Sequence, residues 1–297
     1  MKTPEYREIS THQSSIFISK AGEGPPLLLL HGFPQTHLMW RNIMPLLSDN
    51  FTVVCADLPG YGRSGCPPSA PDHMPHAKRT MARALVDVMR QLGFQQFSVI
   101  GHDRGGRVAY RMALDHPEVI RSVAVLDILP TAEAWNRADK KFALDFWPWS
   151  LLAQAPPLPE KILERCSREI VDNALDEWGT PGEIFTPEIR EAYYGSFNDP
   201  QRIHAICEEY RAAATVDPAH DLADLEKHRQ IECPLLALWS KYLDLTHGAE
   251  NILSMWNRWA RNVQGANIPA GHFFPEEKPS ETAALLRNFL RKHKSGI

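Results

Sequence analysis

The residues around Asp103 have the types and spacing of a reactive turn. A buried strand is expected over Phe97–Ile100, and the run Gly101-His102-Asp103-Arg104-Gly105-Gly106 follows it directly before a helix begins. This is the aspartate form, G-x-D-x-G, of the strand–turn–helix motif in which a sharp turn exposes one nucleophilic side chain. The free N–H groups at the start of the helix favour an anion, so we expect the Asp103 carboxylate to be ionised near neutral pH.

A carboxylate at this position favours a particular kind of chemistry. Its attack on an acyl carbon would give an anhydride, an intermediate with no catalytic advantage. Its attack on a saturated carbon with a leaving group gives an alkyl ester, which water can then cleave. Asp103 therefore predicts displacement at a carbon–halogen bond or an epoxide. The alternative is an aspartate that only caps an ordinary helix.

His272 is the predicted base. Gly271 and His272 lie between the last expected strand and the last expected helix, behind the nucleophile in chain order. A histidine there would take a proton from the water that attacks the ester, and it needs a carboxylate to fix its tautomer and stabilise the imidazolium. Two candidates follow expected strands: Asp127 and Asp244.

Strand and helix patterns alternate on both sides of these residues. Buried strands are expected at 25–30, 51–56, 97–100, 121–126 and 233–239, with a short one near 266–268 and a hairpin over 6–20. Helices are expected near 38–47, 76–92, 249–260 and 279–292. Continuous apolar runs are typical of parallel strands that are buried on both faces. The order nucleophile, acid, late histidine predicts an α/β-hydrolase fold: a mostly parallel twisted sheet flanked by helices.

The alternation stops between the expected strand at 121–126 and the one at 233–239. Residues 129–229 are helical in pattern and rich in Trp, Tyr and Pro. We therefore predict a core formed by 1–128 and 230–297, with 129–229 as an inserted helical cap.

Two backbone N–H groups are expected to stabilise negative charge beside Asp103. His31-Gly32-Phe33-Pro34 follows a central strand, and a turn there can direct the N–H of Phe33 into the space above the sheet. The N–H of Arg104, the residue after the nucleophile, would complete this oxyanion hole. His31 itself is expected to pack and to form hydrogen bonds.

Arg104 and Arg107 indicate an anionic substrate. They are three residues apart at the start of one helix, so they share a face close to Asp103. Two cations at a helix N-terminus oppose the helix dipole and repel each other. A substrate carboxylate between them would relieve both effects and suits the guanidinium fork. Arg111, by contrast, is expected to pair with local acids.

The sequence resembles the haloacetate (fluoroacetate) dehalogenases through almost its whole length. The resemblance is carried by His31-Gly32-Phe33-Pro34, Gly101-His102-Asp103-Arg104-Gly105-Gly106-Arg107, Asp127, Tyr210-Arg211-Ala212-Ala213-Ala214-Thr215 and Gly271-His272. It implies that Asp127 is the acid partner of His272, with Asp244 in reserve, and that Arg104 and Arg107 bind the substrate carboxylate. It also implies a homodimer.

The departing halide needs hydrogen-bond donors that carry no negative charge. Trp147, Trp149 and Tyr210 are candidates, and the resemblance implies Trp149 and Tyr210 as the halide site. The family has a histidine before this tryptophan, whereas Pro148 stands here and has no donor. Because fluoride is the poorest leaving group, we expect chloroacetate or bromoacetate to be preferred over fluoroacetate.

Two other functions use the same residues. An epoxide hydrolase shares the Asp–His–Asp machinery and needs lid tyrosines that protonate the opening oxygen, for which Tyr193, Tyr194 and Tyr210 are available. A neutral epoxide, however, would leave Arg104 and Arg107 without a role. A hydrolase-fold protein that only binds a ligand is the second alternative. A serine esterase is disfavoured because no serine stands in the turn.

Composition narrows the classes of partner. The 297 residues carry a formal charge of -4, which gives no reason to expect nucleic acid or an anionic membrane surface. The five cysteines are scattered, odd in number and without C-x-x-C spacing, so free thiols in the cytoplasm are expected. No metal or cofactor is predicted, and the small halo acid and water are the expected partners.

Overall fold

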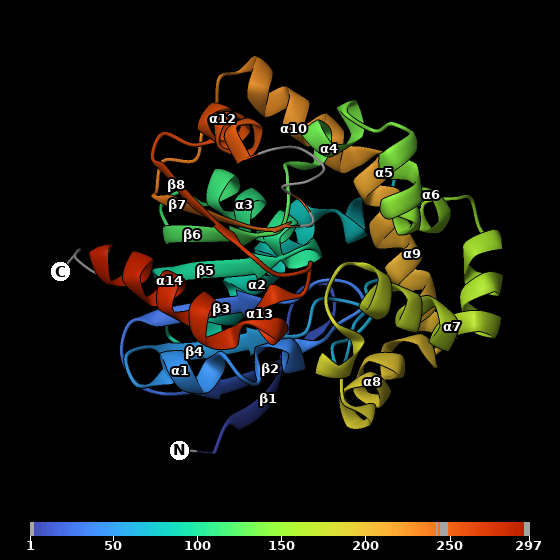
Figure 1. Ribbon diagram of the computed structural model, residues 1–297, viewed down its shortest axis with the longest axis horizontal. Helices are drawn as coiled ribbons and strands as arrows, with labels where there is room; N and C mark the ends of the chain where they lie inside the picture. Colours follow the sequence, from blue (N-terminus) through green and yellow to red (C-terminus); the bar gives the residue numbers. More distant parts are fainter. Residues whose placement is uncertain (1–2, 242, 244–248, 294–297) are drawn as a thin grey trace.

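The structure, a computed structural model, is built on an eight-stranded sheet with the order β1-β2-β4-β3-β5-β6-β7-β8 (Figure 1). It describes residues 3–241, 243 and 249–293. The strands are β1 (Glu5–Ser10), β2 (Ser15–Ala21), β3 (Pro26–Leu30), β4 (Thr52–Ala56), β5 (Phe97–His102), β6 (Ile120–Leu126), β7 (Leu235–Ser240) and β8 (Val263–Ile268). β1 and β2 pair antiparallel, as do β2 and β4, and the pairs from β4 to β8 are parallel. The expected hydrolase sheet and its N-terminal hairpin are confirmed.

The apolar strands supply both faces of the sheet because successive side chains point to opposite sides. In β3, Leu28 and Leu30 belong to one buried cluster, while Leu27 and Leu29 belong to the other. The four side chains are fully buried. Helices therefore cover both faces of the sheet. Polar side chains of a central strand can reach a functional site only at the ends of the strand.

The helices of the sheet region divide between the two clusters. One cluster includes side chains of α2 (Lys78–Gln91), α3 (Arg104–Asp115) and α12 (Ala249–Trp259), and the other those of α1 (Met44–Ser48) and α14 (Pro279–Lys292). Among the described residues, this region also contains the shorter helices η1 (His37–Trp40), η2 (Met74–His76) and α13 (Phe274–Glu277). The expected helix over 38–47 is thus two short pieces. A new helix starts at Met44 because Pro45, which has no N–H, fits only the first turn.

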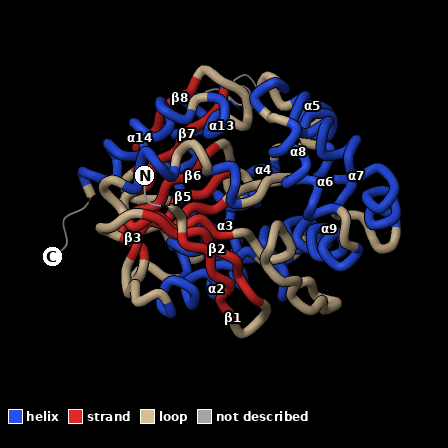
Figure 2. The backbone as a smooth tube through the Cα atoms, turned by 90° about the horizontal axis from the view of Figure 1, so that it is seen from below, coloured by secondary structure: helices blue, strands red, loops and turns tan. Residues whose placement is uncertain are grey.

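Helices form most of the chain between β6 and β7 and gather at one end of the sheet (Figure 2). They are α4 (Thr131–Asn136), α5 (Lys140–Asp145), α6 (Trp147–Leu152), α7 (Leu158–Glu177), η3 (Gly182–Ile184), α8 (Pro187–Tyr194), η4 (Gly195–Phe197), α9 (Pro200–Ala214) and α10 (Val216–Glu226). We call this segment the helical insertion. The division of the chain into a core and a cap domain stays a prediction.

The five cysteines are free thiols in this structure. Among the described residues, no helix is both long enough and apolar enough to cross a membrane.

Candidate active site

Asp103 occupies the sharp turn that its neighbours predict. Its φ of 44° lies in the left-handed region, and it links the end of β5 to the first turn of α3. The turn needs glycine on both sides. A Cβ at Gly101 would lie 2.2 Å from the carbonyl oxygen of Gly105, and one at Gly105 would lie 2.4 Å from that of His31. The two glycines let the helix pack directly against the strand, which fixes the backbone of Asp103.

The carboxylate of Asp103 is buried and already accepts a backbone hydrogen bond. The N–H of Phe33 donates to its Oδ2 at 3.0 Å, as expected for one half of the oxyanion hole. The neighbouring imidazole of His272 and the guanidinium groups of Arg104 and Arg107 hold the pKa of Asp103 below its ordinary value despite its burial. The carboxylate is therefore ionised at neutral pH, the form that a nucleophile needs. The N–H of Arg104 makes no hydrogen bond to this carboxylate within the described residues, so its role in the oxyanion hole stays a prediction.

The structure brings together His272 and Asp127, the predicted base and its predicted acid partner. Nδ1 of His272 lies 2.6 Å from Oδ2 of Asp127. Asp127 also accepts hydrogen bonds from the N–H of Ser240 at 2.7 Å and from its hydroxyl at 3.0 Å. Nε2 of His272 is buried and has no hydrogen-bond partner among the described residues, which leaves it free to take a proton from water. The reserve candidate, Asp244, lies outside the described residues.

The helical insertion holds the loop that carries the base. The N–H of His272 donates to the carbonyl of Trp178 at 2.9 Å, and the N–H of Phe273 donates to the Thr180 hydroxyl at 3.1 Å. A Cβ at Gly271 would lie 2.1 Å from the N atom of Thr180. The segment after α7 and the histidine loop therefore pack as one unit, which the sequence alone did not indicate.

In the predicted two-step reaction, replacing Thr180 with valine should slow only the second step, the hydrolysis of the ester on Asp103. Valine keeps the shape of threonine but cannot accept the Phe273 N–H, so the position of His272 becomes less well defined. We expect decay of the covalent ester to slow by about threefold to tenfold, the range that one neutral hydrogen bond supports. Rapid-quench measurement with bromoacetate separates this decay from the halide burst, which should not change. Thr180→Ser is the matched control, and an equal loss in both steps would contradict the prediction.

The nucleophile and base face a common enclosed cavity. Its polar and aromatic walls include Asp103, Arg107, Asp127, Trp149, Tyr210 and His272. Trp149 and Tyr210 come from α6 and α9, and each offers one N–H or O–H donor. Trp147 does not line this cavity; its indole N–H donates to the Asn173 side chain. Pro148 is buried in the first turn of α6, next to Trp149.

Arg107 is the predicted cation that reaches the cavity. Its Nη1 donates to the carbonyl of Leu129 at 2.7 Å, and its guanidinium lies over the Trp149 ring, 4.3 Å from the centroid. Its Nε is buried without a partner among the described residues. Burial and the neighbouring Arg104 lower the pKa of Arg107 to about 10. The residue stays charged at neutral pH, and an anion in the cavity would compensate that charge.

Arg104 is placed differently. It is fully buried, is not among the residues that line the cavity, and is paired with Glu209 by Nη2 at 2.6 Å. We expected a negative charge to relieve the repulsion between Arg104 and Arg107. The carboxylate of Glu209 supplies part of that negative charge. Sequence reasoning missed Glu209; the only available signal was its place beside Tyr210. Carboxylate binding by Arg104 stays a prediction. Arg111 pairs with local acids as expected, namely Asp115, Asp221 and Asp224.

The three tyrosines that could serve an epoxide hydrolase are in different environments. Tyr210 lines the cavity. Tyr193 donates its hydroxyl hydrogen bond to Glu276, and Tyr194 donates to Asp172. Neither of the latter two lines the cavity, so Tyr210 is the tyrosine that could meet a substrate there.

The chain is similar to two proteins over almost the whole length of each. The chain is 42% identical over 294 residues to a fluoroacetate dehalogenase from a Burkholderia species, a match that covers 99% of this chain and 96% of that protein. It is 31% identical over 289 residues to a soluble epoxide hydrolase from a Corynebacterium species, with 92% and 94% covered. The α/β hydrolase fold family matches over residues 25–155. The chain belongs to the α/β-hydrolase family.

Solved structures similar to this α/β-hydrolase extend the comparison to the helical insertion. A candidate α/β-hydrolase from a Nostoc species superposes with a TM-score of 0.93 at 44% identity, covering 97% of this chain and 98% of that one. A variant of a candidate epoxide hydrolase from Pseudomonas aeruginosa, with bound MFA, gives 0.91 at 40% identity, with 98% and 97% covered. The predicted fold class is confirmed, as is the predicted resemblance to fluoroacetate dehalogenases with epoxide hydrolases nearby.

Proposed function

We propose that this α/β-hydrolase cleaves the carbon–halogen bond of a short 2-halo acid, such as a haloacetate, and yields glycolate and halide. The observation that carries the proposal is the placement of the ionised Asp103 and the cationic Arg107 in one enclosed cavity with the His272–Asp127 pair. Arg107 would bind the substrate carboxylate, and Asp103 would meet the carbon that carries the halogen. The 42% identity to a fluoroacetate dehalogenase supports this substrate class.

The first step forms an ester on Asp103. One carboxylate oxygen attacks the halogen-bearing carbon, the carbon–halogen bond breaks, and the electron pair leaves with the halide. Charge therefore develops on the halogen. The donors of Trp149 and Tyr210, which line the same cavity, would stabilise it.

The second step regenerates the carboxylate. Nε2 of His272 takes a proton from water, and the hydroxide attacks the ester carbonyl carbon of Asp103. The Phe33 N–H, which lies 3.0 Å from Oδ2, would stabilise the tetrahedral oxyanion. Asp127 stabilises the imidazolium. The bond between that carbon and the glycolate oxygen then breaks, and His272 returns the proton to glycolate. The Asp103 carboxyl group, which kept the hydroxide oxygen, loses the remaining proton to solvent and is again a carboxylate.

Four separate incubations test the proposal: chloroacetate, bromoacetate, fluoroacetate and styrene oxide. Chloride or bromide release with an equal amount of glycolate is the expected result. Diol from styrene oxide without halide release would contradict it and favour an epoxide hydrolase. Ligand binding without product from any of the four would favour a protein that only binds its ligand.

The epoxide alternative is favoured by two observations: Tyr210 lines the cavity, and the chain is 31% identical to a soluble epoxide hydrolase. Ring opening needs an acid at the oxygen that leaves the carbon, and a tyrosine hydroxyl can supply it. The cationic Arg107 beside the nucleophile argues against this alternative, since a neutral epoxide offers no negative charge to compensate it.

Pro148 should reduce the cleavage of fluoride relative to chloride. Proline has no donor, so the halide site depends on Trp149 and Tyr210 alone. We expect Pro148→His to raise the ratio of fluoride to chloride release by about tenfold, the value of one hydrogen bond to an anion. Initial rates with fluoroacetate and chloroacetate measure this ratio, with Pro148→Ala as the control for the changed backbone. Fluoride release as fast as chloride release in the unaltered protein would contradict the prediction.

A further inference from the structure

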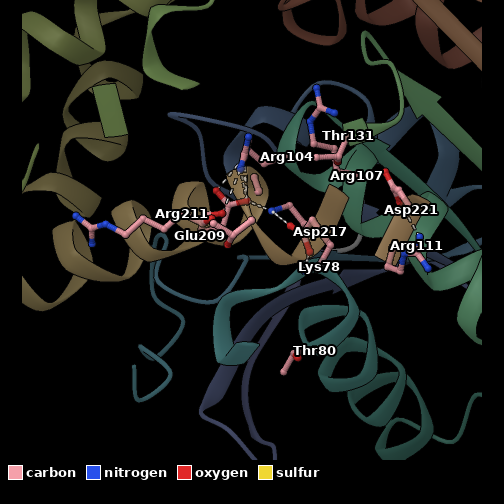
Figure 3. Close-up of polar contacts among 12 residues, drawn as sticks. Lys78, Thr80, Arg104, Arg107, Arg111, Thr131, Glu209, Arg211, Asp217 and Asp221 are labelled. Atoms are coloured by element: carbon pink, nitrogen blue, oxygen red, sulfur yellow. Dashed lines mark hydrogen bonds and ion pairs between the residues drawn. The ribbon is translucent and has the colours of Figure 1, made fainter. Parts of the chain in front are cut away.

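Four buried charges of alternating sign lie in a row beside the nucleophile: Asp217, Lys78, Glu209 and Arg104 (Figure 3). The side chains of Lys78, Glu209, Asp217 and Arg104 are at most 4% exposed. Nζ of Lys78 contacts both Oε1 of Glu209 and, at 3.4 Å, Oδ2 of Asp217. The backbone N–H of Lys78 also donates to Asp217, at 2.9 Å. A buried charge is costly unless it is paired and hydrogen-bonded, and each member of the row is.

The row alternates between the sheet region and the helical insertion. Arg104 and Lys78 begin α3 and α2, whereas Glu209 and Asp217 come from α9 and α10. Glu209 is therefore held from both sides by cations of the sheet region. Those two cations lower its pKa despite its complete burial, so it remains ionised.

Glu209 binds one edge of the Arg104 guanidinium and leaves the other free. Nε of Arg104 lies 2.9 Å from both carboxylate oxygens of Glu209, and Nη2 lies 2.6 Å from Oε1. The next residue, Tyr210, places its ring against the guanidinium, with 4.0 Å from the Arg104 Cζ to the ring centroid. Nη1 of Arg104 is buried and has no hydrogen-bond partner among the described residues.

Two consecutive residues of α9 thus fix Arg104 in two directions. Glu209 binds one edge of the Arg104 guanidinium, and the ring of Tyr210 covers one face of it. Within the described residues, the buried nitrogens of the two arginines that have no hydrogen-bond partner include Nη1 of Arg104 and Nε of Arg107. Such unpaired N–H groups of buried cations are suited to a carboxylate, which accepts charge-assisted hydrogen bonds.

We propose that Glu209, held in place by Lys78, is a positioning residue that orients Arg104 so that its Nη1 edge serves the substrate carboxylate. The inference rests on the proposed function and deepens it. Glu209 touches neither the substrate nor the reacting atoms; it acts through Arg104. The competing interpretation is that Glu209 only neutralises Arg104, in which case its removal would strengthen the binding of an anion.

The test compares two neighbouring glutamates of α9. Glu209→Gln removes the charge that holds Arg104. Glu208→Gln is the matched control: Glu208 is also buried, but it pairs with His73 and Arg211 and does not line the cavity. Calorimetry with acetate measures carboxylate binding without turnover, and quenching of tryptophan fluorescence by bromide measures the halide site.

For Glu209→Gln we expect the Kd of acetate to rise about tenfold or more, the effect of a lost charge-assisted hydrogen bond. The Kd of bromide should stay within about twofold, and Glu208→Gln should change neither value. With chloroacetate, KM should rise more than kcat falls. Tighter acetate binding, unchanged acetate binding, or an equal loss of acetate and bromide binding would each overturn the proposal.

Glu209→Asp is a second variant that tests the proposal if Glu209→Gln does not fold. It keeps the negative charge between Arg104 and Lys78, but its shorter side chain cannot hold Arg104 in the same place. Acetate binding should weaken in this variant too, and unchanged binding would overturn the proposal. If the unaltered protein binds acetate but releases no halide from any haloacetate, the proposed function fails while this inference remains testable.

Discussion

Replacing His272 with glutamine is expected to trap the protein as an ester on Asp103. The first step needs only the ionised carboxylate, so halide should still be released once per active site. The second step loses its base, because Nε2 of His272 is the atom that would take the proton from water. This atom is buried and has no hydrogen-bond partner in the described part of the chain. General-base catalysis of this kind contributes about a thousandfold, so turnover should fall by about that factor.

Mass spectrometry of the intact variant after mixing with bromoacetate measures this result. We expect a gain of one carboxymethyl group per chain, located on the peptide that contains Asp103. His76→Gln is a matched control, since His76 is equally buried but does not line the cavity. Turnover at the unaltered rate by His272→Gln, or a loss of the halide burst, would contradict the assignment of His272 to the second step.

Replacing Asp103 with asparagine should abolish halide release itself. The amide is a poor nucleophile, and loss of the covalent step typically costs about four orders of magnitude or more. The variant should still bind acetate, because the buried N–H groups of Arg104 and Arg107 remain. An ion-selective electrode gives the rate of bromide release, and calorimetry with acetate shows that the site is folded. Substantial halide release by Asp103→Asn would mean that water, and not Asp103, attacks the substrate.

Local sequence patterns predicted much of the fold and of the reactive turn. The glycines around Asp103 have a steric reason to be there, since a Cβ at Gly101 or Gly105 would clash with backbone atoms. The apolar runs of β3 to β7 predicted a buried parallel sheet for the same kind of local reason. The helix expected over 38–47 was wrong in detail, since Pro45 starts a second short helix.

Contacts between distant segments could not be predicted in the same way. Glu209 meets Arg104 across 105 positions of the chain, and this contact depends on where the helical insertion places α9 relative to the first residue of α3. Trp178 and Thr180 meet the His272 loop for similar reasons. The spacing of Arg104 and Arg107 correctly predicted a negative charge nearby. The sequence alone does not show whether a substrate or a buried glutamate supplies that charge.

The acid partner of His272 was predicted only in part: local sequence gave the candidates, and a contact between distant segments was needed to choose between them. Asp127 and Asp244 each follow an expected strand, so spacing alone left both open. The structure places Asp127 2.6 Å from His272 and braces it with two hydrogen bonds from Ser240. This distance, which periodicity cannot supply, supports Asp127 as the acid partner, while Asp244 lies outside the described residues.

A single turnover in water enriched with heavy oxygen tests most directly whether Asp103 is the nucleophile. The protein is mixed in excess over chloroacetate, and both the glycolate and the Asp103 peptide are analysed by mass spectrometry. If Asp103 is the nucleophile, the glycolate hydroxyl carries an ordinary oxygen from the protein and the heavy oxygen enters the Asp103 carboxylate. Heavy oxygen in the glycolate with an unlabelled Asp103 would contradict it, because water would then have displaced the halide directly.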